Sequence, residues 1–88
     1  MAASKRLYVA LAESIGLELG YQRSKVRNAE ILGEAVNHDA VHALRDLLGK
    51  IMHDLRSDNH RFDSERFEDA VNLQAARTCE AYLKVERA

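Results

Sequence analysis

Histidines and a carboxylate at helical spacing are the first residues that could do chemistry in this chain. Glu34, His38 and His42 are four residues apart, and on one continuous helix they would share a face suited to zinc. Residues 37–39 are polar, however, and indicate a break between helices that would separate these side chains. The other histidines have no partner cysteines. We therefore expect no metal site and no cofactor.

Residues for nucleophilic or acid–base catalysis are equally sparse. The single cysteine, Cys79, falls on the inner edge of the last predicted helix, where it is expected to be a small core residue. Adjacent acidic residues such as Glu68 and Asp69 diverge by about 100° on a helix, so they cannot act together on one substrate atom. There is no glycine-rich phosphate loop, nucleophile elbow or HExxH sequence. The sequence predicts a protein that is not an enzyme and has no catalytic residues.

Three basic residues, Arg23, Lys25 and Arg27, are the candidates for contact with nucleic-acid phosphates. Residues 11–17 look like the opening of a helix-turn-helix, but polar residues occupy the apolar positions that should follow. The net charge is −1, so no overall positive field attracts nucleic acid. We expect a solvated basic face. Two alternatives are a small nucleic-acid-binding regulator, which requires one exposed patch with the basic residues 5–6, and a protein that binds an acidic partner.

The clearest local signal is a helix junction at residues 58–67. Asn59 is predicted to stop one helix in the left-handed conformation, and Asp63 to cap the next. Phe62 and Phe67 occupy the two positions of a hydrophobic staple, which fixes how the chain enters the helix. An alternative interpretation makes this junction an exposed recognition corner for a protein partner, built from Asn59, His60, Arg61 and Arg66.

The residues of this junction also carry a resemblance. Small helical proteins from phages and mobile elements of actinobacteria often contain a similar Asp-Asn-x-x-Phe-Asp-x-x-Arg-Phe string. Here it comprises Asp58, Asn59, Phe62, Asp63, Arg66 and Phe67, followed by Ala70, with a second matching patch at Arg6, Tyr8, Leu11 and Ala12. The chain departs from that pattern at His60, where proline is common, and in the long helix after the motif. The resemblance implies a phage or mobile-element origin and no particular activity.

Hydrophobic spacing predicts helices along nearly the whole chain. Leu7, Leu11, Ile15 and Leu19 recur every four residues and indicate a first helix over about residues 4–19. Ser4 is its expected N-cap, and Gly20 its left-handed C-terminal residue. A second helix is predicted over about residues 24–36, with Gly33 inside it; a third helix is expected to begin at Asp39 as N-cap and to end near residues 56–59.

The last two helices have the strongest apolar faces. Val41, Leu44, Leu48, Ile51 and Leu55 step by three and four residues, as in helices that pack at a shallow angle, and Leu47 and Met52 widen that stripe. Gly49 in that helix is expected to mark the close approach of another helix. The final helix follows Phe62 and is predicted to bury Phe67, Val71, Ala75, Thr78, Tyr82 and Val85. Its opposite side carries Leu73, Ala76 and Leu83, which we expect to bind protein, through isologous pairing of two copies.

Composition limits the class of protein. The 88 residues are 47% hydrophobic and 31% charged, which is typical of one small folded domain over residues 1–88. We expect an all-α fold, a small bundle of three to four antiparallel helices. The lone cysteine, with no apolar run of membrane-spanning length and no signal sequence, predicts a cytoplasmic protein without membrane association. The sequence therefore favours a non-enzymatic accessory protein that binds a host or phage protein, as a host-factor modulator or defence inhibitor.

Overall fold

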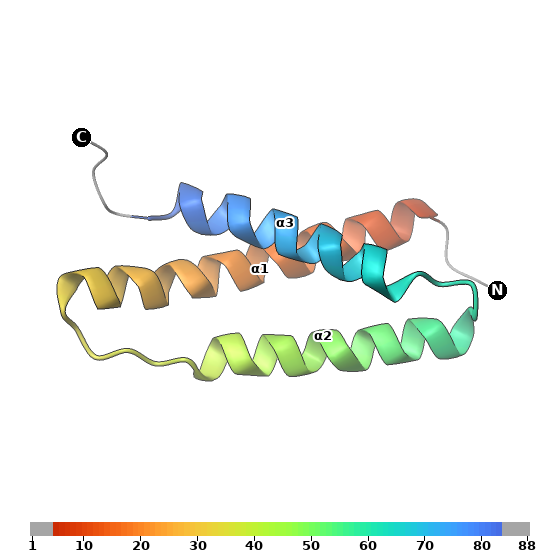
Figure 1. The fold of residues 1–88 in the computed structure, drawn as a ribbon, viewed down its shortest axis with the longest axis horizontal. Coiled ribbons are helices and arrows are strands. Elements are labelled where there is room, and N and C mark those ends of the chain that lie inside the picture. Colours follow the sequence, from red (N-terminus) through yellow and green to blue (C-terminus); the bar gives the residue numbers. More distant parts are fainter. Residues whose placement is uncertain (1–4, 84–88) are drawn as a thin grey trace.

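The computed structural model describes residues 5–83 and folds them into three α-helices (Figure 1). These are α1 (Lys5–Leu32), α2 (Asp39–Asp58) and α3 (Ser64–Ala81), and no strand occurs among the described residues. The predicted all-helical bundle is confirmed, with three helices. Neighbours in the chain are antiparallel, but α1 and α3 run in the same direction, so the expected antiparallel arrangement does not extend to this pair (Figure 1). None of the three helices combines the length and hydropathy of a membrane-spanning segment.

The closest contact in the fold joins α1 to α3. Ala12, Gly16, Gly20 and Ser24 recur every four residues along α1, and all four are buried. A Cβ atom built on Gly16 would lie 2.6 Å from Gln74 Cβ, far inside van der Waals contact. Such a row of small residues lets two helix backbones approach more closely than side chains would otherwise allow. Helix α3 crosses α1 (Figure 1), and its residues Gln74, Ala75 and Thr78 lie against Gly16 and Gly20.

The polar side chains at this contact have hydrogen-bond partners. The Ser24 hydroxyl, 1% exposed, donates to the Tyr21 carbonyl oxygen at 2.6 Å. The Thr78 hydroxyl oxygen accepts a hydrogen bond from the Gln74 side-chain amide at 3.0 Å. Both buried hydroxyl groups therefore have partners. Among the described residues, every buried side-chain N or O atom has a hydrogen-bond partner.

The predicted division of the N-terminal half into two helices is wrong. Gly20 lies inside α1, because its missing Cβ makes room for the Ala75 carbonyl and for Thr78 instead of permitting a turn. The helix ends at Gly33, the one described residue with positive φ, at 69°. The Gly33 amide donates to the Glu30 carbonyl at 3.2 Å, and the Glu34 amide donates to the Ala29 carbonyl at 2.8 Å. These two hydrogen bonds form a Schellman motif, so Gly33 terminates the helix and does not lie within it.

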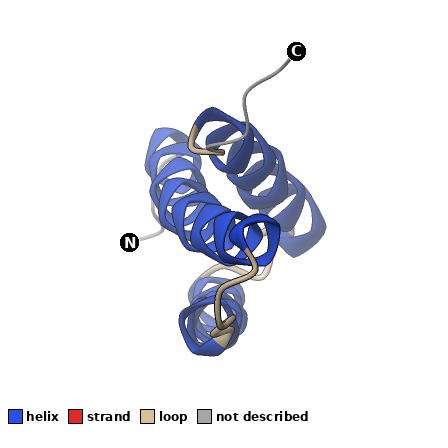
Figure 2. Cartoon of the chain, turned by 90° about the vertical axis from the view of Figure 1, so that its left-hand side faces the viewer, coloured by secondary structure: helices blue, strands red, loops and turns tan. Residues whose placement is uncertain are grey.

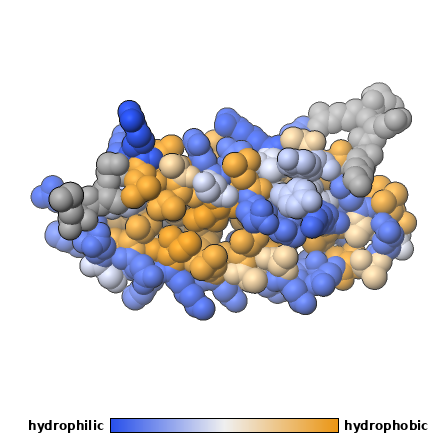
Figure 3. All heavy atoms as spheres, turned by 180° about the vertical axis from the view of Figure 1, so that it is seen from behind, coloured by the Kyte–Doolittle hydropathy of each residue, from blue (hydrophilic) through white to orange (hydrophobic). Residues whose placement is uncertain are grey.

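Helix α2 lies apart from the other two helices (Figure 2). Only Leu48 of this helix is buried, at 4% exposure, whereas Leu47 is 50% exposed. The remaining residues of its predicted stripe are half-buried, namely Val41, Leu44, Ile51, Met52 and Leu55. On the face opposite to that of Figure 1, apolar side chains gather over the start of α1 and the end of α2 (Figure 3). The helix is therefore present as predicted, but its apolar face is only partly covered.

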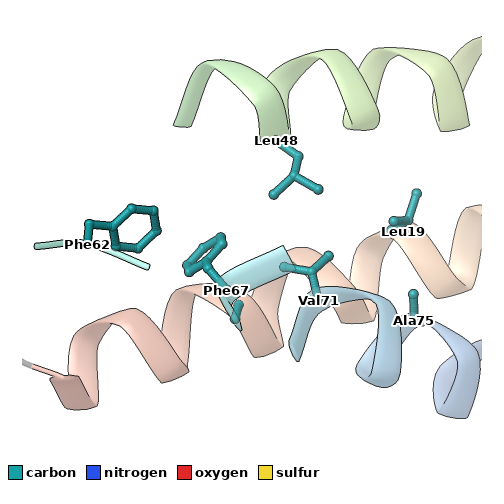
Figure 4. Close-up of a cluster of buried hydrophobic side chains, with 7 residues drawn as sticks. Leu19, Leu48, Phe62, Phe67, Val71 and Ala75 are labelled. Carbon is teal, nitrogen blue, oxygen red and sulfur yellow. The ribbon is translucent and has the colours of Figure 1, made fainter. Parts of the chain in front are cut away.

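The buried core is small and lies where α2 faces the α1–α3 contact. Leu48 extends from α2 toward Val71 and Phe67 of α3, and Leu19 of α1 points into the same space (Figure 4). Leu19 and Val71 are fully buried. Each fully buried aliphatic side chain contributes about 1.5–3 kcal/mol, so these few residues carry a large share of the stability of the domain.

Three further local expectations are corrected. Asp39 is the first residue of α2 and not its cap; His38 holds the cap position, and the Asn37 side-chain oxygen accepts the Asp39 amide hydrogen bond at 2.8 Å. Gly49 is exposed, with nothing within 4 Å of a built Cβ, because the close approach occurs on α1 and not on α2. Tyr82 is 54% exposed because it lies at the C-cap, past the end of the α3 core face. Ser4 and Val85 fall outside the described residues.

The α1–α3 contact makes a direct prediction for its glycines. Gly20→Ala is expected to lower the free energy of unfolding by about 1–3 kcal/mol, because the new methyl group overpacks a contact with no free space. Urea unfolding followed by circular dichroism measures this change. Gly49→Ala is the matched control in α2, and it should raise stability by up to about 1 kcal/mol through helix propensity alone. Equal stabilisation by both substitutions would contradict the close contact.

Candidate functional site

The junction between α2 and α3 has the predicted cap and staple. The Asp63 carboxylate accepts a hydrogen bond from the Arg66 amide at 3.1 Å, and Asp63 is the N-cap of α3. The rings of Phe62 and Phe67 lie 5.4 Å apart in an edge-on arrangement, and both are buried. Both elements of the prediction are confirmed. The first turn of α3 is thereby fixed against the segment that precedes it.

Asn59 ends α2 in a different way from the one predicted. Its backbone is extended, with φ of −141° and ψ of 102°, and not left-handed. This conformation is stabilised because the Asn59 side-chain oxygen accepts the Arg61 amide hydrogen bond at 3.1 Å, and its carbonyl accepts the Phe62 amide at 2.8 Å. The side-chain amide of Asn59 also donates to the Tyr8 hydroxyl at 3.4 Å. The asparagine therefore ties the junction to α1, a contact that a local cap would not make.

A row of three aromatic rings extends this link from α1 to α3. The Tyr8 and Phe62 ring centroids are 5.2 Å apart, and Phe62 in turn contacts Phe67. Such tilted and edge-on ring pairs contribute about 0.5–1.5 kcal/mol beyond their buried area. The row holds the start of α1 and the first turn of α3 together at one end of the molecule.

A cavity of about 520 Å³ opens beside this row. Apolar and aromatic residues supply most of its surface, and three cationic residues and one carboxylate border it. We call it the junction pocket; its lining consists of Lys5, Tyr8, Val9, Ala12, Asn59, Arg61, Phe62, Asp63, Arg66, Phe67 and Ala70. A volume of this size is within the range of sites that bind small ligands or single anchoring side chains.

The rim of the junction pocket is positively charged. Lys5, Arg61 and Arg66 are all exposed, and Asp63, the one acidic lining residue, is engaged by the amide that it caps. Because α1 and α3 are parallel, their N-terminal ends lie at the same end of the molecule, and the positive end of the α3 dipole adds to this charge. The site combines an apolar floor with a cationic edge.

The structure brings together part of the predicted recognition corner. Asn59, Arg61 and Arg66 line the junction pocket, whereas His60 is exposed and does not. Sequence reasoning did not assign to this site the residues that α1 and the second turn of α3 contribute, namely Lys5, Tyr8, Val9, Ala12 and Ala70, although Tyr8, Ala12 and Ala70 belong to the two patches of the resemblance. The signal for them was the four-residue spacing of small residues on α1, which marks the face that meets another helix.

Two of the other predicted protein-binding residues lie on α3, where Leu73 is 54% exposed and Ala76 is exposed. Leu83 lies past the end of that helix, contrary to the prediction, and is half-buried. None of them lines the junction pocket. Their role in pairing two copies stays a prediction.

The basic residues of α1 do not form one patch. Arg23 and Lys25 are about 160° apart around the helix, and residues 5–6 lie about 27 Å away along it. Arg23 is half-buried, and burial together with nearby Arg45 lowers the pKa of its guanidinium, which stays charged at neutral pH. The Lys25 ammonium lies 4.7 Å from the centre of the Tyr21 ring, and Arg27 is exposed. The geometry required for the nucleic-acid alternative is therefore not present in the described residues.

His38 and His42, the two histidines considered for zinc, lie close together, but among the described residues no third ligating side chain lies beside them. His38 and His42 stack with ring centroids 6.0 Å apart, and Glu34 lies in the segment between α1 and α2. Across residues 5–83, no group of three or more histidine, cysteine, aspartate or glutamate side chains is placed to hold a metal ion.

Comparison of the chain with protein-family models, with curated proteins and with solved structures gives no match.

The cap of α3 gives the prediction for this site. Asp63→Ala is expected to lower the free energy of unfolding by about 1 kcal/mol, because the Arg66 amide loses its acceptor. Asp63→Asn retains an oxygen acceptor and should cost much less, so thermal unfolding of the two variants isolates the cap. A loss of the same size in both would show that the charge of Asp63, and not its hydrogen bond, stabilises the junction.

Proposed function

We propose that this chain is a non-enzymatic accessory protein that binds a short segment of another protein in the junction pocket. The observation that carries the proposal is the combination of an apolar floor and a cationic rim in one cavity. An apolar side chain of the partner fills the cavity between Val9, Phe67 and Ala70. Acidic residues beside that anchor lie against Arg61 and Arg66, in the complementary arrangement typical of protein interfaces.

The lining of the pocket supports binding over catalysis. No serine, cysteine or histidine is among the described residues that line it, so the lining offers no hydroxyl or thiol nucleophile paired with an imidazole base. Its hydroxyl group, on Tyr8, accepts a hydrogen bond from Asn59, and its carboxylate caps α3. These polar groups hold the shape of the pocket.

The origin and cellular setting belong to the same proposal. The resemblance to phage and mobile-element proteins supports a partner from the host or the phage, and hence a role as host-factor modulator or defence inhibitor. The single cysteine supports a reducing cytoplasm. The acidic character proposed for the bound segment agrees with an acidic protein partner, but it moves the contact from the Arg23 region to the rim of the junction pocket.

The binding experiment uses labelled eight-residue peptides and the full chain. An acidic peptide with a central phenylalanine should bind and shift the NMR signals of Tyr8, Phe67 and Ala70. Two comparison peptides, one with serine in place of phenylalanine and one with lysines in place of the acidic residues, should bind at least about tenfold more weakly, a difference of 1.4 kcal/mol. Equal binding of all three would contradict the proposed site.

Two charge reversals on α3 test where the peptide binds. Arg66→Glu should weaken the acidic peptide about tenfold through repulsion at the rim. The substitution leaves the fold intact, because glutamate at this position forms a capping box with Asp63. Arg77→Glu is the control, since Arg77 is exposed on the same helix and does not line the pocket. Equal weakening by both reversals would mean that only the net charge of the chain matters.

A further inference from the structure

The junction pocket is a short groove with a helix on each side. Its lining includes positions 5, 8, 9 and 12 on α1, and positions 63, 66, 67 and 70 on α3 and its N-cap. Both sets are spaced by three and four residues, so each forms one stripe along its helix. A stripe of this kind covers two turns and is about 10 Å long. Because α1 and α3 run in the same direction, the two stripes form opposite walls of one groove (Figure 1).

The two ends of this groove differ in charge. The cationic residues lie at the end where both helices begin: Lys5 is the first residue of α1, Arg61 precedes α3, and Arg66 belongs to its first turn. Ala12 and Ala70 line the other end, one to two turns further along. The groove therefore has a direction, from a cationic end to an end lined by small apolar side chains.

Helix α2 leaves the groove accessible. None of the described lining residues belongs to α2, and the chain reaches the groove only past the end of that helix, through the segment 59–63. On the walls, Val9 is 49% exposed and Arg66 is exposed. A segment of another protein can therefore lie along the groove without displacing a helix of this chain.

The lining can donate hydrogen bonds but has few acceptors to offer. Its three cations only donate. Its side chains that can accept are those of Tyr8, Asn59 and Asp63, and each already accepts one hydrogen bond from within the fold. The described residues also include no strand whose edge could pair with an extended segment. An extended segment would bury amide groups that face few acceptors, which is unfavourable, whereas a helix satisfies its backbone internally.

We infer, on the basis of the proposed function, that the segment bound in the junction pocket is an α-helix antiparallel to α1 and α3, with acidic residues at its C-terminal end. The last carbonyl groups of a helix are unpaired and carry a negative partial charge, and cationic side chains stabilise both. The antiparallel direction places this end at the cationic rim. The apolar face of the bound helix then lies against Val9 and Phe67, and the small side chains of Ala12 and Ala70 permit its close approach.

The first experiment tests the direction of the bound helix with two alanine-based peptides of about 14 residues, long enough to form a helix. Both have the same composition and a central phenylalanine; the acidic residues follow it in one peptide and precede it in the other. The full chain should bind the first at least about tenfold more tightly in fluorescence anisotropy titrations. Acidic residues stabilise a free helix when they are near its N-terminus, so helix propensity alone predicts the opposite order. Equal binding, or tighter binding of the second peptide, would overturn the inferred direction.

Two variants of the chain show whether this preference arises in the groove. Arg66→Glu should remove most of the difference between the two peptides, because it reverses a charge at the cationic end. Arg77→Glu should retain the difference, since Arg77 is exposed on the same helix outside the lining. The same loss in both variants would overturn the placement of the acidic end at the rim.

The second experiment tests the conformation of the bound segment. Proline in place of an outward-facing central alanine of the tighter peptide should weaken binding at least about tenfold, and glycine at that position only about fivefold. Carbon chemical shifts of the labelled peptide in the complex should be helical. Extended shifts with no effect of proline, or binding by the eight-residue acidic peptide alone, would overturn the helix and leave the proposed function intact. Failure of every acidic peptide to bind would overturn both.

Discussion

The fold depends on the contact between the backbones of α1 and α3 at Gly16 and Gly20. Two helical glycines cost about 2 kcal/mol in helix propensity relative to alanine. That cost is offset because the close approach buries Leu19, Val71 and Ala75 completely. In a domain with so few buried residues, the alignment of these two helices determines which other side chains can meet. The remaining structure follows from the direction in which they cross.

Two features follow from the parallel arrangement of α1 and α3. Their N-terminal ends lie together, so Tyr8 of the first helix meets Phe62 and Phe67 at the start of the last, and the junction pocket forms beside this row. Helix α2 serves as the antiparallel return between them and packs mainly through Leu48. A helix held in this way retains an apolar flank, on which Leu47 is 50% exposed. One contact thus accounts for both the pocket and the incomplete cover of α2.

The features that sequence reasoning predicted correctly are those that depend on neighbours in the chain. The cap at Asp63, the Phe62–Phe67 staple and the limits of α2 are set by residues within a few positions of one another. Gly20 shows why other features were not predictable in this way. A glycine after an apolar stripe has the same local pattern whether it ends a helix or admits another backbone, and only α3, more than fifty residues later, distinguishes the two.

For the same reason, sequence reasoning predicted only the side of the pocket that the α2–α3 junction supplies. Asn59, Arg61 and Arg66 belong to one local junction and were singled out from their types and spacing. The α1 side of the pocket depends on the pairing of α1 with α3, to which Asn59 itself contributes through Tyr8. The extended backbone of Asn59 is likewise a consequence of partners at the junction and on α1, since its side chain bonds there instead of closing α2 alone.

Hydrogen exchange of the full chain in dilute solution, read by mass spectrometry, tests this account most directly. A stable α1–α3 pair with α2 packed lightly against it predicts the slowest exchange in residues 12–24 and 67–78, without a fast segment at Gly20. It predicts exchange in α2 that is faster by at least about tenfold, because that helix opens without disrupting the glycine contact. Protection in α2 equal to that in α1, or rapid exchange around Gly20, would contradict the central role of the α1–α3 contact.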